Sequence, residues 1–181
     1  HRMSGSVIVR MLEVWYCFFG MPDIDPALLN DWLEQHQAVL MVKPHPMAAI
    51  ANPQSWPFLK IIDDVWLRDH AVSLYELLGA SDILITDISS AVIDYLLLDR
   101  PVIHAFPDLA EYRISRGFTV EPIEDYFAGA VVRCQAELIA ALTEEIGGRD
   151  PHAGRRRKLR GLSHEHQDAG ATARLLAAIG L

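Results

Sequence analysis

The segment from Ser81 to Leu98 constrains the fold more than any other part of the chain. Ile83-Leu84-Ile85 is an unbroken apolar run, which is typical of a strand buried on both faces of a parallel sheet. Four polar residues come next in close succession: Thr86, Asp87, Ser89 and Ser90. An apolar stretch of helical length follows them. This order of strand, short polar turn and helix predicts one βα unit of a doubly wound sheet.

The remainder of the chain repeats this alternation. Expected strands cover residues 38–43, 58–62, 82–86 and 102–106, and a buried first strand with its following loop covers 7–21. Expected helices cover 26–37, 72–79, 89–98, 135–146 and 171–180, with loops at 63–69 and 108–112. The pattern predicts an α/β fold, a Rossmann-like and mostly parallel sheet with helices on both faces. We expect a single domain over residues 1–181, in which 147–181 form a peripheral C-terminal helical segment.

Composition and charge narrow the function classes. The chain has 181 residues, 51% of them hydrophobic, so it can bury a sizeable core. Its 24 acidic and 16 basic residues give a net charge of −8, which argues against general nucleic-acid binding, because that needs a concentrated basic surface. Cys17 and Cys134 lie far apart without metal-ligand spacing, so we expect no zinc site and a cytoplasmic protein.

The apolar residues 7–21 raise the question of a membrane segment. A spanning helix needs about 20 apolar residues, whereas this stretch is shorter and contains Arg10 and Glu13. A buried first strand is the favoured interpretation, and contact with a membrane interface is the alternative.

The polar turn at 86–90 is the first candidate site. A helix that begins at the carboxyl end of a buried strand presents unpaired N–H groups, which suit a phosphate. Thr86, Ser89 and Ser90 would bind such an anion, or they would only cap the helix. Asp87 would repel a phosphate directly, so we expect it to cap, to orient a hydroxyl or to hold a partner cation.

The second candidate is Lys43-Pro44-His45-Pro46, directly after an expected strand. The flanking prolines restrict the backbone and fix where the His45 imidazole points. Lys43 is either a phosphate-binding cation or a surface lysine, and His45 is either functional or incidental to a rigid loop.

The third candidate is Arg116-Gly117. The planar guanidinium of Arg116 can donate two hydrogen bonds to a phosphate, and a surface salt bridge to Glu111 or Asp108 is the alternative. Gly117 allows close backbone approach or a positive φ.

Three other groups have simpler interpretations. A buried, hydrogen-bonded structural role is favoured for His104, inside an expected strand. His164, His166 and Asp168 have the spacing of metal ligands, but no further ligand follows at helical spacing. The basic run at 155–160 is either a solvated helix face or a contact with anionic lipid or a polyphosphate acceptor.

The order of these motifs resembles that of the CDP-glycerol glycerophosphotransferase family, whose members build teichoic-acid-like chains. The resemblance rests on segments spread over about residues 38–176: Lys43-Pro-His45-Pro, Leu74-Tyr-Glu-Leu-Leu78, Ser81-Asp-Ile-Leu-Ile-Thr-Asp-Ile-Ser-Ser90, Asp94-Tyr95, Arg100-Pro101, Asp108, Tyr112, Arg116-Gly-Phe118 and Gln167-Asp-Ala-Gly-Ala-Thr-Ala-Arg174.

This resemblance implies the C-terminal, donor-binding lobe of a GT-B-like transferase. The implied partners are CDP-glycerol or a similar CDP-alditol, a polymer or lipid-linked acceptor, and a separate acceptor lobe or subunit; no cofactor, metal or nucleic acid is implied. The implied location is cytoplasmic, with peripheral contact at the inner face of the plasma membrane as the open question.

The resemblance also implies residue roles. His45 matches the family's catalytic histidine. Thr86, Ser89 and Ser90, with Asp87 between them, match the turn near the donor's pyrophosphate, and Arg116-Gly117 matches an Arg-Gly-Phe motif. The alternatives are a nucleotide-binding module or fragment without catalysis, and a glycosyltransferase lobe that uses a UDP-sugar.

The chain departs from the family pattern in three ways. Ile88 replaces the usual tyrosine of the turn, residues 10–19 lack the expected Pro-Thr-aromatic-Arg motif, and no Pro-Gly pair follows Phe118. The acceptor lobe with its own histidine motif is not in this sequence. The chain is therefore a fragment, a subunit that needs a partner, or a degenerate relative.

Overall fold

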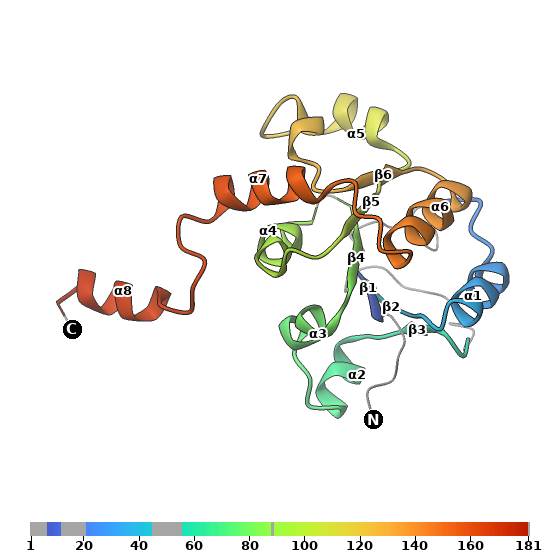
Figure 1. Ribbon diagram of the computed structural model, residues 1–181, viewed down its shortest axis with the longest axis horizontal. Coiled ribbons are helices and arrows are strands. Elements are labelled where there is room, and N and C mark those ends of the chain that lie inside the picture. The colour runs from blue at the N-terminus through green and yellow to red at the C-terminus, as the bar shows by residue number, and fades with distance from the viewer. Residues whose placement is uncertain (1–6, 12–20, 45–55, 88, 181) are drawn as a thin grey trace.

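A parallel β-sheet forms the centre of the molecule (Figure 1). The computed structural model describes residues 7–11, 21–44, 56–87 and 89–180. Within these ranges the sheet has six strands: β1 (Val7–Met11), β2 (Val39–Lys43), β3 (Leu59–Ile61), β4 (Ile83–Thr86), β5 (Val102–Ala105) and β6 (Ala130–Val132). Their order is β3-β2-β1-β4-β5-β6, and every neighbouring pair is parallel. The predicted Rossmann-like sheet is confirmed.

The strand order reverses at the centre of the sheet. From β1 the chain moves outward to β2 and β3, and it then returns to the other side of β1 to form β4. Val9 accordingly lies in register with Met41 of β2 on one side and Leu84 of β4 on the other. The two chain directions diverge beyond the carboxyl ends of β1 and β4, and ligands bind at this position in doubly wound sheets.

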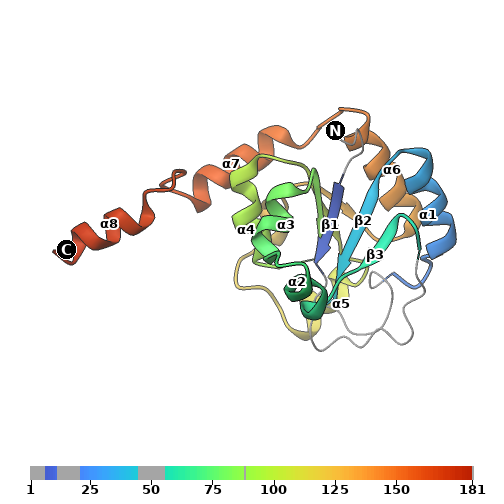
Figure 2. The same ribbon diagram turned by 90° about the horizontal axis from the view of Figure 1, so that it is seen from below.

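Helices cover both faces of the sheet. The described helices are α1 (Pro26–Gln35), α2 (Asp64–Asp69), α3 (Leu74–Ala80), α4 (Ala91–Tyr95), α5 (Leu109–Ser115), α6 (Gln135–Ile146), α7 (Ala153–Ser163) and α8 (Ala171–Ala178), with 3-10 turns η2 (Leu96–Leu98) and η3 (Ile123–Tyr126). Figure 2 shows α1 and α6 on one face and α3, α4 and α7 on the other. The helix α5 covers neither face and lies at the edge towards which β1 and β2 run (Figure 2).

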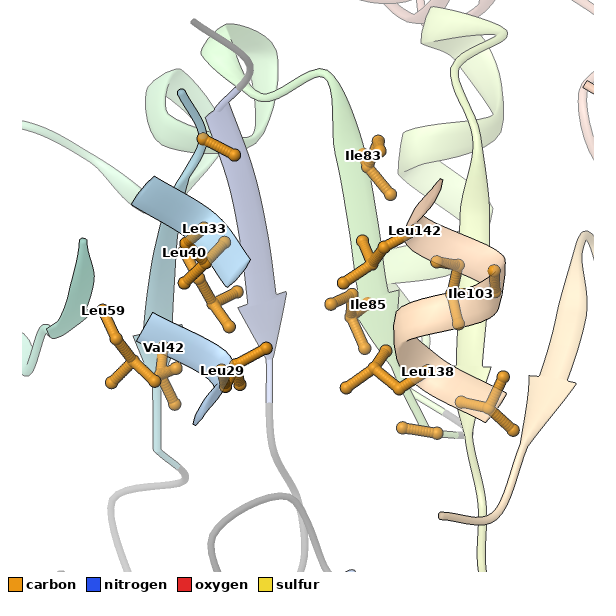
Figure 3. Packing of buried hydrophobic residues seen from close by; sticks show 14 of the residues in the cluster. Leu29, Leu33, Leu40, Val42, Leu59, Ile83, Ile85, Ile103, Leu138 and Leu142 are labelled. Atoms are coloured by element: carbon orange, nitrogen blue, oxygen red, sulfur yellow. The ribbon is translucent and has the colours of Figure 1, made fainter. Parts of the chain in front are cut away.

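Alternating side chains of the strands make two cores. Ile83 and Ile85 of β4 pack with Leu138 and Leu142 of α6 in the first core (Figure 3). Leu84, between them in sequence, faces the second core with residues of α3, α4 and α7. All four residues of β4 are buried, as the unbroken apolar run predicts. Fully burying each such side chain stabilises the fold by about 1.5–3 kcal/mol.

Several elements differ from the sequence expectations. Loops were expected at 63–69 and 108–112, and these segments contain the short helix α2 and the first part of the short helix α5. Both are too short to show a helical apolar period, although Asp63 caps α2 through a 2.7 Å bond from the Trp66 N–H. The helix expected at 72–79 begins at Leu74, because Ser73 and Glu76 form a capping box. The three-residue strand β6 was missed for the same lack of length.

The C-terminal helices differ in how they meet this body. Arg156 and Leu159 fix α7 to it, and both are buried. None of the residues of α8 is buried, and α8 extends away from the sheet in both views (Figures 1 and 2).

Candidate anion-binding site

The structure places the described candidates at or beside the carboxyl edge of the sheet. Lys43 is the last residue of β2 and Thr86 the last residue of β4. Arg116 directly follows α5, which lies at the same edge (Figure 2). His45 and Ile88 lie outside the described residues.

The turn after β4 offers hydroxyl groups in two different states. Ser89 is buried, and its Oγ accepts a hydrogen bond from the Ala91 N–H at 3.3 Å, so Ser89 performs the expected capping. Ser90 is exposed, and its side chain caps nothing although it occupies the N-cap position. Among the described residues, no group pairs with the fully buried Thr86 Oγ1. Of the hydroxyl groups in this turn, that of Ser90 is the one exposed to solvent.

The helix behind this turn is shorter than the sequence suggests. The expected helix at 89–98 consists of α4, five residues long, followed by the tighter turn η2. Such a short helix adds little macrodipole. Its first main-chain N–H groups are already engaged: that of Ala91 donates to Ser89 Oγ, that of Val92 to the Ser89 carbonyl oxygen at 3.2 Å and that of Ile93 to the Ser90 carbonyl oxygen at 2.9 Å.

The side chain of His104 on β5 holds the backbone of the turn. The His104 side chain is buried, and its Nδ1 lies 3.1 Å from the Asp87 carbonyl oxygen. The Ala128 N–H donates to His104 Nε2 at 3.0 Å, so Nε2 is the acceptor and Nδ1 carries the proton that it donates. Burial lowers the pKa of His104 to about 4. The predicted structural role of His104 is confirmed, and its partner proves to be the candidate turn.

Lys43 has an acidic partner that the sequence did not suggest. Its Nζ lies 2.9 Å from Asp64 Oδ1 at the start of α2, and its side chain is largely buried while that of Asp64 is exposed. The pair places a positive charge at the end of β2 and holds it there. A phosphate that approaches Lys43 would have to share this cation with Asp64.

The segment around Arg116 forms an aromatic cluster. Tyr112 stacks on Phe118 with ring centroids 5.2 Å apart, and the Arg116 guanidinium lies 5.7 Å from the Tyr112 ring centroid. Within the described part of the chain, Arg116 makes no ion pair, so the alternative of a salt bridge to Glu111 or Asp108 is wrong. Gly117 has a φ of 69°, as its expected role in a positive-φ turn requires.

Two contacts at the site escaped sequence reasoning. The sequence around Asp64 shows only an acidic segment. Its partner, Lys43, lies 21 positions earlier on β2, so no local pattern indicates the ion pair. His104 was recognised as buried, but the sequence cannot indicate that it bonds to Asp87. The hydroxyl of Ser90 and the guanidinium of Arg116 are groups of the kind that bind oxyanions in proteins. No group of three metal-ligating side chains occurs among the described residues.

The sequence as a whole now identifies the family. The profile of the family described as CDP-Glycerol:Poly(glycerophosphate) glycerophosphotransferase matches residues 5–181. The chain belongs to this family. The resemblance found in the motifs is thereby confirmed.

Relatives in this family are teichoic acid enzymes. The chain is 32% identical over 130 residues to the teichoic acid ribitol-phosphate polymerase TarK of Staphylococcus aureus, which covers 72% of this chain and 24% of that protein. It is also 32% identical over 117 residues to the teichoic acid ribitol-phosphate primase of Bacillus spizizenii, or 64% of this chain and 28% of that protein. The chain therefore spans about a quarter of the length of these relatives.

Solved structures agree on the fold. A variant of the wall teichoic acid polymerase TagF soaked with CDPG matches with a TM-score of 0.71 at 23% identity, over 96% of this chain and 41% of that one. The glycosyltransferase SnogD from Streptomyces nogalater matches with a TM-score of 0.58 at 12% identity, over 98% of this chain and 44% of that one. The expected likeness to one lobe of a GT-B-like transferase is confirmed at the level of the fold.

Proposed function

We propose that this chain supplies the donor-binding lobe of an enzyme that transfers glycerol phosphate, or a related alditol phosphate, from a CDP-alditol to a teichoic-acid-like polymer. The observation that carries this proposal is the position of the turn at 86–90. It follows β4, the neighbour of β1 across the point where the strand order reverses, and it exposes the Ser90 hydroxyl there. Membership of the glycerophosphotransferase family supports the same assignment.

The donor's pyrophosphate is the part of the substrate that this edge suits. In our proposal the exposed Ser90 hydroxyl donates a hydrogen bond to it. Ser89 holds the turn in shape, since its Oγ is already engaged with Ala91. Lys43 and Arg116 supply positive charge from β2 and from the end of α5. Asp87 is buried in the turn and serves to shape it rather than to touch the phosphate.

The reaction itself needs positioning and charge stabilisation more than covalent chemistry. An acceptor hydroxyl oxygen bonds to the phosphorus that bears the alditol, the bond from this phosphorus to the bridging oxygen breaks, and CMP leaves. The acceptor proton passes to a base. His45, which follows Lys43 by two positions, either accepts this proton when neutral or offsets the charge on the departing phosphate when protonated.

Calorimetric titration of the chain tests donor binding. We expect CDP-glycerol to bind more tightly than CMP or UDP-N-acetylglucosamine. Ser90→Ala should weaken CDP-glycerol binding by about five- to tenfold, because it removes a hydrogen bond to a charged group worth about 1–1.5 kcal/mol. Ser163→Ala, which removes an exposed hydroxyl from α7, is the matched control and should bind like the unaltered chain. Equal binding of all three ligands, or none, would contradict the proposal.

A second titration separates Lys43 from its neighbour. If Lys43 contacts the donor's phosphate, Lys43→Ala weakens binding, whereas Asp64→Asn leaves the cation without its carboxylate partner and strengthens binding. Weaker binding in both variants would mean that the pair only holds α2 against β2.

Nucleotide binding without transfer is a second candidate function for these 181 residues. A lobe that covers 41% of TagF can hold a nucleotide donor without completing the transfer. Donor binding without CMP release by the 181-residue chain would support this binding role. Turnover that is lost in His45→Ala while binding persists would support the transferase and a chemical role for His45.

A further inference from the structure

His104 lies on β5 between two parts of the candidate site. Its side chain is buried, and the residue stands in register with Thr86 of β4 on one side and Val131 of β6 on the other. Alternate residues of a strand share a face of the sheet, so the imidazole lies on the face opposite Ile103 and Ala105 of the first core. The ring is therefore placed between the turn after β4 and the segment that leads into β6.

The first part is the turn that carries the Ser90 hydroxyl. The His104 Nδ1–H donates to the Asp87 carbonyl oxygen at 3.1 Å. Further along the turn, the Ile93 N–H donates to the Ser90 carbonyl oxygen at 2.9 Å. The second bond joins the turn to α4, and the bond from His104 joins it to β5.

The second part is the aromatic segment that carries Arg116. The Phe127 ring is buried, and its centroid lies 4.8 Å from that of His104. Phe127 belongs to the buried cluster against which Tyr112 and Phe118 pack. The Arg116 guanidinium lies over the Tyr112 ring. One imidazole thus contacts the turn through a hydrogen bond and the cluster that carries Arg116 through its ring.

The orientation of this imidazole is itself fixed. The Ala128 N–H donates to Nε2 at 3.0 Å, so both ring nitrogens of His104 are engaged. Burial lowers the pKa of His104 to about 4, which keeps the ring neutral at neutral pH. Because Nε2 accepts, Nδ1 carries the single proton of the ring. This buried donor has a set direction, and it determines where the Asp87 peptide lies.

We propose that His104 is a positioning residue for the donor's phosphates: by holding the Asp87 peptide, it keeps the Ser90 hydroxyl where the pyrophosphate binds. This inference rests on the proposed function, since it gives a buried residue a part in donor binding. His104 itself does not touch the donor. A turn that lacks this bond adopts other arrangements, and the apparent Kd rises as the correctly arranged fraction falls.

Two substitutions of His104 separate its two hydrogen bonds. The amide nitrogen of asparagine can occupy the position of the imidazole Nδ1, so His104→Asn can keep the donor to Asp87. The longer glutamine reaches the position of Nε2, so His104→Gln can keep the acceptor for the Ala128 N–H and loses the bond to the turn. Each variant retains one of the two bonds, but only the first retains the bond that matters for the donor.

Calorimetric titration with CDP-glycerol at neutral pH compares the two variants. We expect His104→Gln to weaken binding about five- to tenfold, because losing one hydrogen bond lowers the correctly arranged fraction by about this factor. His104→Asn should bind within about twofold of the unaltered chain, since the bond to Asp87 is kept. Leu142→Ala, in the first core on the other face of the sheet, is the control (Figure 3). It should lower the melting temperature and leave donor binding unchanged.

A double-mutant cycle shows whether the effect passes through the Ser90 hydroxyl. If His104 acts by placing this hydroxyl, His104→Gln should weaken binding less than about twofold once Ser90→Ala is present. A role confined to the stability of the core would give the same factor in both backgrounds. Circular dichroism of every variant shows whether it is folded.

Hydrogen exchange of the free chain adds a measurement that needs no donor. The Ile93 amide, which is bonded to the Ser90 carbonyl, should exchange faster in His104→Gln than in His104→Asn. Equal exchange in the two variants, or additive effects in the cycle, would overturn the positioning role.

The positioning role and the proposed function can fail separately. Donor binding that Ser90→Ala weakens and His104→Gln leaves unchanged would overturn the positioning role alone. No donor binding by the unaltered chain would overturn the proposed function, and faster exchange in His104→Gln would then show a turn that His104 holds without a donor.

Discussion

His104 links the candidate turn to the segment that precedes β6 through one imidazole. Its Nδ1–H donates to the Asp87 carbonyl and its Nε2 accepts from the Ala128 N–H, so the neutral ring satisfies two main-chain groups. Protonation at Nε2 would break the second bond and place a charge in the core. The residue is therefore built to stay neutral, and burial accordingly lowers its pKa to about 4.

The stability of the fold should depend on pH through this residue. A free histidine titrates near 6.5, so the unfolded chain binds a proton between about pH 6.5 and 4 that the folded chain does not. The stabilisation that comes from keeping His104 neutral is fully present above pH 6.5 and is lost as the pH falls from 6.5 towards 4. We expect the free energy of unfolding to drop by about 2 kcal/mol between pH 7 and pH 5 on this account.

Urea denaturation at several pH values, compared with that of His104→Asn, measures this dependence. The variant lacks the titrating group, so its stability should vary less over the same range even if it is lower throughout. An identical pH dependence in both proteins would assign the effect to other groups.

Glu145 should make the free energy of unfolding depend on pH in the opposite direction. Its Oε2 is buried and has no hydrogen-bond partner in the described part of the chain. Burial, reinforced by the nearby Asp150, raises the pKa of Glu145 to about 7. The folded state thus favours the protonated form, and its stabilising effect is lost as the pH rises from about 4.5 through 7.

Glu145→Gln should therefore stabilise the protein at pH 8 and change it little at pH 5. We expect a gain of about 1 kcal/mol, which allows for solvent screening of this half-exposed group. Thermal melts at both pH values give the comparison, with the exposed Glu144→Gln as control. A gain of the same size at pH 5 would mean that shape rather than charge is responsible.

At the scale of single residues, the sequence predicted the candidates better than their contacts. Ser90, Thr86 and Lys43 were found because capping and cationic residues stood directly after apolar runs. That Ser89 rather than Ser90 caps α4, and that Asp64 pairs with Lys43, depends on distances between segments far apart in the chain. Such distances follow from packing and leave no local pattern.

Among the elements, α7 is attached to the body in an unusual way. The Arg156 side chain is 2% exposed, and it bonds to Asp99 at 3.2 Å and to Asp150 at 2.6 Å. It also donates to the Asp99 carbonyl oxygen at 3.1 Å. Asp99 has a φ of 51°, which turns its carbonyl towards the helix just after η2. One guanidinium thus joins α7, the end of η2 and the turn after α6.

Loss of this guanidinium should release α7. Arg156→Ala leaves Asp150 without its cation, removes the shortest ion pair of Asp99 and opens a buried space, so we expect destabilisation by about 3 kcal/mol. Arg157→Ala, next to it but exposed and 4.0 Å from Asp99, should cost less than about 1 kcal/mol. Chemical denaturation measures both, and hydrogen exchange should rise selectively over 153–163 in the first variant. Equal effects of the two substitutions would contradict this assignment.

The elements themselves were predictable where they are long or fully buried. The strand at 83–86 and the helix at 135–146 follow from an unbroken apolar run and from a clear amphipathic period. The short helices α2 and α5 and the strand β6 were not found, since three to seven residues hold no complete period. It is α5 that carries Arg116 to the carboxyl edge, so this part of the site was also the least predictable.

At the scale of the whole molecule, the candidate site depends on the order and direction of the strands more than on any one segment. The candidate cations and hydroxyls follow or end β2, β4 and α5, and those of β2 and β4 share one edge of the sheet because every strand runs parallel. If donor binding assembles these parts, it should also stabilise the entire lobe. We expect the melting temperature to rise with CDP-glycerol concentration. At a ligand concentration one hundred times Kd, binding should add about 2.7 kcal/mol to the free energy of unfolding.

Differential scanning calorimetry with and without CDP-glycerol checks this expectation. Ser90→Ala should need more ligand for the same shift, in proportion to its weaker binding. A melting temperature independent of ligand would contradict donor binding by this chain.

The central place of β1 has a consequence for how the chain reaches its native state. β1 ends at Met11, but its second neighbour, β4, begins only at Ile83. During synthesis on a ribosome, β1 can pair with β2 early, while its other edge stays open until β4 at Ile83–Thr86 has emerged. An open edge of this kind is a template for wrong pairing, and non-local parallel pairing is slow. Folding of this lobe should therefore respond to the rate of translation before Ile83 and to chaperones that shield β1.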